Sequence, residues 1–182
     1  EKIKEEVMKK MIYYLSFLRG ENLNIESIYC GFRCQDKGDQ LENDKFHSDI
    51  FCHSPKAFIY INNVDLDGKP FLYLVSSHKD YKARNDLEKI TNKSIYYETS
   101  KFGYKSSRIE ENVNYQKDYL KKYQKFTGIV KVGSAIFADT CGFHAKGPGN
   151  KPRYTFQVTT KRKNLINKII SIVWIKNFIS FS

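Results

Sequence analysis

The sequence has little of what marks a membrane or a secreted protein. Its most apolar stretch, 169–181, is interrupted by Lys176 and Asn177 and is too short and too polar to span a bilayer, and no secretory signal is recognisable. Only four Cys are present, and the Cys30-x3-Cys34 spacing is not that of a zinc ribbon. We therefore expect a cytoplasmic protein with reduced thiols and no membrane span.

Acidic residues are also scarce: 20 Asp and Glu stand against 31 Lys and Arg, a net charge of +11. Such an excess is compatible with an acidic partner, such as nucleic acid, an anionic membrane surface or a phosphorylated substrate. We favour AT-rich codon usage as its origin, because Lys, Asn, Ile and Tyr are all abundant. The basic residues are spread along the chain, with short runs only at 121–122 and 161–163, so we expect no dedicated nucleic-acid surface.

The length and the apolar content indicate one globular domain. The chain has 182 residues, 41% of them hydrophobic, which suffices for a sizeable core and is unlike a disordered composition. We expect a single domain over 1–182. The first residue is Glu1 and not Met, which leaves open that an N-terminal segment is absent.

Most of the chain has the pattern of short strands. Apolar residues at three- and four-residue spacing predict a helix over 1–19, and a basic, apolar tail at 161–181 predicts a second. A polar insertion at 80–127 has helical character at 85–90 and 112–126 only, and we expect a loop at 145–152. The predicted strands are 27–35, 45–51, 56–61, 71–75, 128–132, 135–138 and 153–160. This pattern predicts a mainly β fold, a β-barrel or jelly roll with flanking helices.

One of these strands, 45–51, carries two potential metal ligands. His47 and Asp49 are one residue apart, and in an extended strand residues i and i+2 point to the same face. His144 is the best candidate for a third ligand. Two His and one carboxylate on one face of an ion are typical of non-haem Fe(II) oxygenases. We interpret His53 and His78 as structural.

The blocks around these ligands resemble the phytanoyl-CoA dioxygenase family over about 28–160. The first block has the His-x-Asp strand, a Lys-led aromatic strand (56–61), a turn ending in Gly68-Lys69-Pro70, and Ser76-Ser77-His78. The second block has a strand (133–140) leading into Gly142-Phe143-His144 and then Arg153. Three features depart from the family: Lys69 stands between Gly and Pro, Ser76 stands where Gly is usual, and the chain is shorter than most members at its N-terminus.

The resemblance implies a double-stranded β-helix (jelly roll, cupin-like) that uses Fe(II), 2-oxoglutarate and O2 to hydroxylate a small organic substrate, with 2-oxoglutarate converted to succinate and CO2. It makes His47, Asp49 and His144 the metal ligands. Arg153, nine residues after His144, would hold the far carboxylate of 2-oxoglutarate, because Arg offers a rigid, permanently charged fork. Because Asp49 fills a position on iron that a halide would need, we expect hydroxylation and not halogenation.

Other residues near the ligands have weaker predicted roles. Lys56 and Tyr60 share a strand face and would meet the co-substrate or line its pocket. Phe46 and Phe143 each precede a ligand and would pack behind the site. Asp139 would orient a ligand or simply end its strand.

Two other interpretations of the chain stay open. One is a non-catalytic basic β-barrel that binds an anionic partner and keeps a relic or zinc-filled metal site. The other is a truncated, inactive member of the family. The residues of the 80–127 insertion carry no recognisable code for a substrate, and no pattern predicts the oligomeric state.

Overall fold

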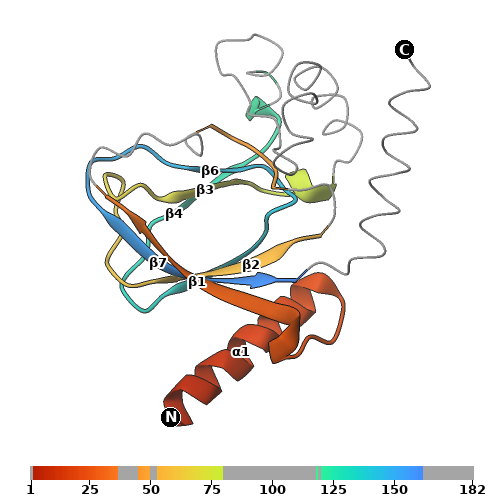
Figure 1. Ribbon diagram of the computed structural model, residues 1–182. Helices are drawn as coiled ribbons and strands as arrows, with labels where there is room; N and C mark the ends of the chain where they lie inside the picture. Colours follow the sequence, from red (N-terminus) through yellow and green to blue (C-terminus); the bar gives the residue numbers. More distant parts are fainter. Residues whose placement is uncertain (1, 37–44, 50–52, 80–117, 119, 162–182) are drawn as a thin grey trace, which may run out of the picture.

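The computed structural model describes residues 2–36, 45–49, 53–79, 118 and 120–161, and within them the chain forms two facing β-sheets and one long helix (Figure 1). Helix α1 spans Lys2–Arg19, and two short 3-10 turns, η1 and η3, span Ile25–Ser27 and Ser77–Lys79. The strands are β1 (Ile28–Gln35), β2 (Pro55–Tyr60), β3 (Phe71–Leu74), β4 (Lys125–Gly128), β5 (Ala135–Asp139), β6 (His144–Lys146) and β7 (Arg153–Thr160).

The order of the strands is that of a jelly roll. The larger sheet runs β1-β7-β2-β5 and the smaller runs β4-β3-β6, and every pairing is antiparallel. Strands far apart in the chain lie side by side, as β1 does with β7 and β3 with β6. This arrangement confirms the predicted mainly β, cupin-like fold. No helix among the described residues is long and apolar enough to cross a membrane.

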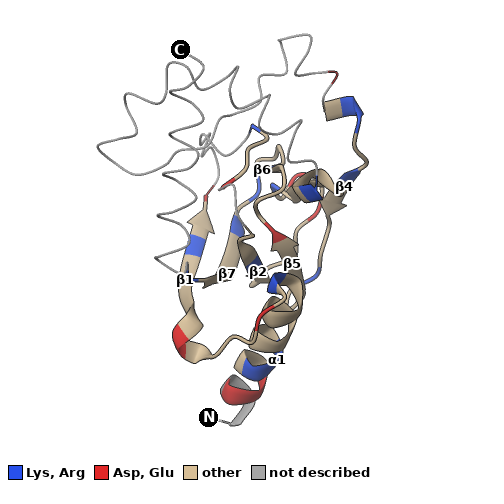
Figure 2. Cartoon of the chain, turned by 90° about the vertical axis from the view of Figure 1, so that its right-hand side faces the viewer, with Lys and Arg blue, Asp and Glu red and all other residues tan. Residues whose placement is uncertain are grey.

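Helix α1 covers the outer face of the larger sheet (Figure 1). The apolar stripe that predicted the helix supplies Leu15, which is fully buried against Ile28, Ala57 and Val158 of the sheet. Tyr14 extends the contact to Phe137 of β5, with the ring centroids 5.0 Å apart. Figure 2 shows Lys and Arg spread over α1, β1, β4 and β7, with acidic residues between them on α1.

The inner face of the larger sheet looks toward the smaller one. Residues directly opposite in an antiparallel pair share a face, so the pairing of Tyr60 with Thr155 places both on one side, together with Arg153 two residues along β7. Phe58, two residues before Tyr60, lies on the same face and contacts Phe71 of β3 across the two sheets, at 4.9 Å between ring centroids. The side chains on this face therefore point into the jelly roll.

Most of the predicted elements are present within a residue or two. The helix over 1–19 is α1, and the strands over 27–35, 56–61, 71–75, 135–138 and 153–160 are β1, β2, β3, β5 and β7. The predicted helices at 85–90 and 161–181 lie outside the described residues except for Lys161. So does most of the 80–127 insertion, of which 118, 120 and 121 are helical.

Three predicted elements were wrong in the residues that are described. The strand expected at 128–132 lies at 125–128, so the last two residues of the helix expected over 112–126 belong to β4. Beyond Gly128 the chain leaves β3, and Val130 makes a single bridge to Val64. The first two residues of the loop expected at 145–152 belong to β6. The sequence did not predict this strand, because three residues are too few to show a strand period. No regular strand forms over 45–49, the described part of the strand expected at 45–51. This segment makes a single β-bridge, between His47 and His144.

The two serines in the turn after β3 have opposite structural roles. Ser76 has φ 68, in the left-handed region that Gly adopts without strain. The hydroxyl of the buried Ser77 accepts a 2.8 Å hydrogen bond from the Phe143 N–H.

We expect Ser76→Gly to raise the free energy of unfolding by about 0.5–1 kcal/mol, because left-handed strain of about 1–2 kcal/mol exceeds the entropic cost of Gly, about 0.5–1 kcal/mol. Ser77→Ala should lower it by about 1–3 kcal/mol, because it leaves the buried N–H of Phe143 without its acceptor. Chemical denaturation of the two variants measures both changes. Equal effects of the same sign would contradict this interpretation of the turn.

Candidate metal centre

The two candidate histidine ligands face each other across a backbone pairing. The His47 N–H donates to the His144 carbonyl and the His144 N–H to the His47 carbonyl, both at 2.9 Å. This reciprocal pair adds residue 47 to the outer edge of β6, and directly opposite residues of an antiparallel pair project from the same face. The imidazole centroids are consequently 4.4 Å apart.

Both imidazoles are oriented by the same local hydrogen bond. His47 Nδ1 lies 2.9 Å from the Lys45 carbonyl and His144 Nδ1 lies 3.0 Å from the Gly142 carbonyl, in each case two residues back along the chain. A carbonyl oxygen only accepts, so each Nδ1 carries a proton and donates it. In the neutral ring the lone pair is then on Nε2, the arrangement that a metal-binding histidine requires.

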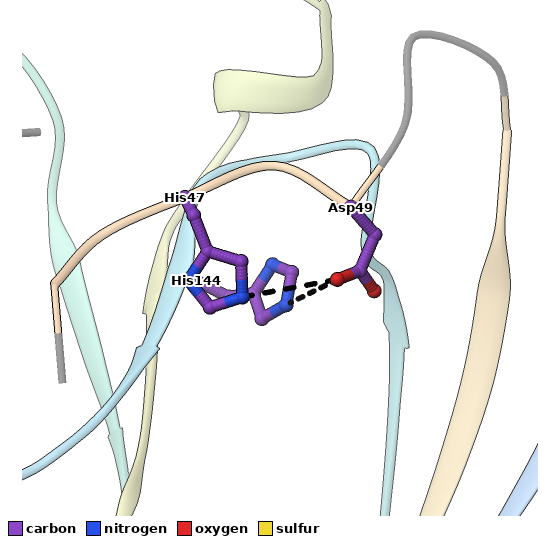
Figure 3. A group of neighbouring side chains, drawn as sticks. All are labelled: His47, Asp49 and His144. Carbon is purple, nitrogen blue, oxygen red and sulfur yellow. Dashed lines mark ion pairs between the residues drawn. The ribbon is translucent and has the colours of Figure 1, made fainter. Parts of the chain in front are cut away.

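Asp49 completes the group (Figure 3). Its Oδ1 lies 3.7 Å from His47 Nε2 and 3.6 Å from His144 Nε2, and one ligand atom from each residue lies within 4.8 Å of the other two. The Asp49 backbone N–H donates to the Thr140 carbonyl at 2.9 Å, which holds this residue against the turn after β5. The structure thus brings together all three residues that the sequence pattern singled out.

Lys56 determines which oxygen of Asp49 faces the imidazoles. Its Nζ donates to Oδ2, so Oδ1 is the oxygen turned toward Nε2 of both histidines. Burial would raise the pKa of Asp49, but hydrogen bonding and charge from His144, when no metal is bound and its ring is protonated, and from Lys56 outweigh it and hold that pKa well below its usual range. Asp49 is therefore a carboxylate at neutral pH.

The back of the site is apolar. Phe46 and Phe143, the residues before the two histidines, are buried with Leu74 and Ala145 in one cluster. Gly142 lies where the chain passes Tyr73, and a Cβ there would collide with the Tyr73 hydroxyl. A larger residue would push the turn away and shift the carbonyl that orients His144.

The other predicted site residues lie on the inner face of the larger sheet. Arg153 is 8% exposed and its guanidinium donates to the Lys69 carbonyl. Tyr60 is 1% exposed; burial raises its pKa to about 12, although the positive charge of Arg153 acts in the opposite direction. Tyr60 is therefore a protonated phenol at neutral pH, near a permanent cation.

The sequence pattern did not indicate two features of the interior. Lys146 is buried and, through the pairing of β6 with β3, shares the face of His144. The sequence predicted a loop at Lys146, where a lysine is ordinarily exposed, so its burial in the interior could not be foreseen. The contact of Lys56 with Asp49 was also unforeseen, because it depends on how the chain returns after Asp49.

We expect the Lys56–Asp49 ion pair to contribute measurably to the free energy of unfolding. Its side chains are 20% and 25% exposed, whereas those of the Lys151–Asp65 pair are 58% and 56% exposed. We expect Lys56→Met to lower the free energy of unfolding of the metal-free protein by about 1.5–3 kcal/mol, because a half-buried carboxylate loses its charged donor. Lys151→Met is the matched control and should have a smaller effect, since water screens an exposed pair. Equal losses in urea denaturation would contradict the role given to Lys56.

Comparison with known proteins gives distant structural similarities only. No protein-family model and no curated protein matches the sequence. SnoN, a non-haem alpha-ketoglutarate dependent epimerase from nogalamycin biosynthesis, is 10% identical with a TM-score of 0.49, over 84% of this chain and 52% of that one. SnoK, a non-haem alpha-ketoglutarate dependent carbocyclase from nogalamycin biosynthesis, is 13% identical with a TM-score of 0.44. The match covers 72% of this chain and 48% of that one.

The Kdo hydroxylase KdoO, a non-haem Fe(II) alpha-ketoglutarate dependent dioxygenase, is 14% identical with a TM-score of 0.42, over 75% of this chain and 54% of that one. The chain spans about half the length of the three structures. These similarities are too low to assign a function, which has to rest on the side chains of the site.

Proposed function

We propose that the chain is an Fe(II)- and 2-oxoglutarate-dependent dioxygenase that hydroxylates a small organic substrate. One observation carries the proposal: His47 Nε2, His144 Nε2 and Asp49 Oδ1 converge from two segments almost a hundred residues apart, with both imidazoles already oriented for metal binding. The resemblance of the surrounding sequence blocks to the phytanoyl-CoA dioxygenase family supports the same assignment.

The ligand atoms of His47, Asp49 and His144 suit the non-haem Fe(II) of such a dioxygenase. Two imidazole nitrogens and one carboxylate oxygen suit Fe(II), and three protein ligands leave other coordination positions for a co-substrate and dioxygen. Bound iron would supply the activation of dioxygen that is coupled to oxidation of 2-oxoglutarate to succinate and CO2. His47, Asp49 and His144 would hold the ion.

Lys56 would keep Asp49 a one-oxygen ligand. Because Oδ2 accepts from the Lys56 ammonium, only Oδ1 is turned toward the imidazoles. The buried rings of Phe46 and Phe143 would exclude water from the rear of the site. Oxidation would then be confined to the side on which the substrate enters.

Arg153 would receive the far carboxylate of 2-oxoglutarate. Its burial on the inner face of the larger sheet places a permanent charge where an ion is poorly solvated, which favours an anionic partner. The hydrogen bond to the Lys69 carbonyl limits the movement of the guanidinium. Tyr60, as a buried neutral phenol, would add a hydrogen bond from the same face, and Lys56 would contribute positive charge.

Conversion of 2-oxoglutarate to succinate tests the proposal without knowledge of the substrate. Purified protein with Fe(II), ascorbate, 2-oxoglutarate and air should produce succinate slowly, because oxidation of the co-substrate proceeds to some extent without the main substrate. A screen of small organic acids, thioesters and neutral metabolites for faster succinate formation would then identify the substrate class. Succinate no higher than in a chelator-treated sample, with every compound, would favour a non-catalytic barrel with a relic site.

A further inference from the structure

A second group of potential metal ligands lies in the described part of the chain, next to the first. His53 lies two residues before β2, Asp139 ends β5, and Cys141 lies in the turn between β5 and β6. One ligand atom from each lies within 4.8 Å of the other two. The proposed oxygenase chemistry uses none of these three side chains.

The geometry of Asp139 resembles that of Asp49. Its Oδ1 accepts from the backbone N–H of Ser54 at 2.9 Å and of Cys141 at 3.0 Å, which fixes the carboxylate. Its Oδ2 is turned toward His53 Nδ1, which contacts it directly. One oxygen is thus held by the protein and the other is presented to an imidazole, as at the first centre.

Burial differs strongly among the three residues. Cys141 is fully buried and Asp139 is 8% exposed, whereas the side chain of His53 is 51% exposed. The thiol and the carboxylate lie in the protein interior, and the imidazole lies between them and the solvent. An ion would therefore have an entry path past His53.

We propose that His53, Asp139 and Cys141 form a second metal site, which binds Zn²⁺. A cysteine thiolate with an imidazole and a carboxylate is a donor set that suits zinc, in contrast to the wholly nitrogen and oxygen set of the first centre. Zinc bonds of about 2.0–2.3 Å at tetrahedral angles put neighbouring ligand atoms roughly 3.3–3.5 Å apart, below the 4.8 Å within which these three atoms lie. His53 and Asp139, which are in direct contact in the metal-free chain, would move apart to admit the ion. The ion would displace the thiol proton and the proton shared by His53 and Asp139, and water would be the fourth ligand.

This second site adjoins the iron ligands through the backbone. The Thr140 carbonyl accepts the Asp49 N–H at 2.9 Å, and the Cys141 carbonyl accepts the Ser48 hydroxyl at 3.0 Å. Thr140 in turn donates from its N–H and its hydroxyl to the Ser54 carbonyl. Zinc would therefore stiffen the turn against which Asp49 is held.

Cobalt(II) titration of the whole chain tests this site separately from the first. Cobalt substitutes for zinc, and only a thiolate ligand gives an intense near-ultraviolet charge-transfer band. We expect two Co²⁺ per chain and such a band in the parent. Cys141→Ser should abolish the band. His53→Gln changes a half-exposed side chain and should weaken the cobalt affinity of this site more than tenfold, because loss of an outer-shell partner alone costs roughly 10–100-fold.

Two controls separate this site from Cys30 and Cys34 and from the first centre. Cys30→Ser/Cys34→Ser, which changes two exposed thiols, and His144→Ala should both retain the band. A parent without the band, or a band unchanged in both Cys141→Ser and His53→Gln, would overturn the zinc site. Neither result would bear on whether the first centre binds Fe(II), because that centre contains no thiolate.

Discussion

Replacing His144 with Ala is expected to reduce Fe(II) affinity by more than about 100-fold and to abolish the conversion of 2-oxoglutarate to succinate. Loss of an outer-shell partner alone costs roughly 10–100-fold in metal affinity, and loss of one of three protein ligands should cost more. The backbone bonds that join His144 to His47 do not involve the side chain, so the pairing should survive. Anaerobic Fe(II) titration measures the affinity directly.

His78→Ala is the matched control for this prediction. His78 lies in η3 with its Nδ1 3.3 Å from the Tyr73 hydroxyl, and it is not part of the metal group. Its replacement should leave Fe(II) affinity within a fewfold of the parent. If His144→Ala binds one Fe(II) as tightly as His78→Ala does, His144 is not a ligand and the assignment is wrong.

Arg153→Leu is expected to raise the 2-oxoglutarate concentration needed for half-maximal turnover by about two to three and a half orders of magnitude. Removing one partner of a buried charge pair costs about 3–5 kcal/mol, and each 1.4 kcal/mol is a factor of ten in affinity. Fe(II) uptake should be nearly unchanged, because Arg153 donates to the Lys69 carbonyl and contributes no metal ligand. The prediction is therefore that Arg153→Leu loses affinity for 2-oxoglutarate but not for Fe(II), and both affinities are measured on this one variant.

Arg153→Lys makes this prediction sharper. Lys keeps the charge but lacks the planar fork that binds a carboxylate through two hydrogen bonds, so an intermediate loss of 2-oxoglutarate affinity is expected. A parental requirement in both variants would show that another group, such as Lys56 or Lys146, holds the co-substrate. Loss of Fe(II) binding in both variants would instead indicate a structural role for Arg153.

The sequence predicted the parts of the structure that repeat a clear period over many residues. The stripe that ends in Leu15 and Leu18 predicted α1, and the alternation over 153–160 predicted β7. The inference that His47 and Asp49 project together was also correct, although the segment is not a regular strand. The backbone bonds of His47 to His144 and of Asp49 to Thr140 replace the strand geometry.

What the sequence could not predict depends on contacts between distant segments. Strand β6 has three residues and exists because Lys146 and His144 pair with Phe71 and Tyr73. The position of β4 is likewise set by pairing with β3, and not by the apolar run at 129–132. The contact of His53 with Asp139 was not predicted either, because the two residues are 86 positions apart in the sequence.

One measurement tests the oxygenase proposal most directly: the visible spectrum of the anaerobic protein as Fe(II) and then 2-oxoglutarate are added. If His47, Asp49 and His144 hold Fe(II) and leave adjacent positions open, 2-oxoglutarate should chelate the metal and produce a weak visible charge-transfer band. The band should be absent in His144→Ala and should require far more 2-oxoglutarate in Arg153→Leu. A parent protein that takes up Fe(II) but shows no band at saturating 2-oxoglutarate would contradict the proposal.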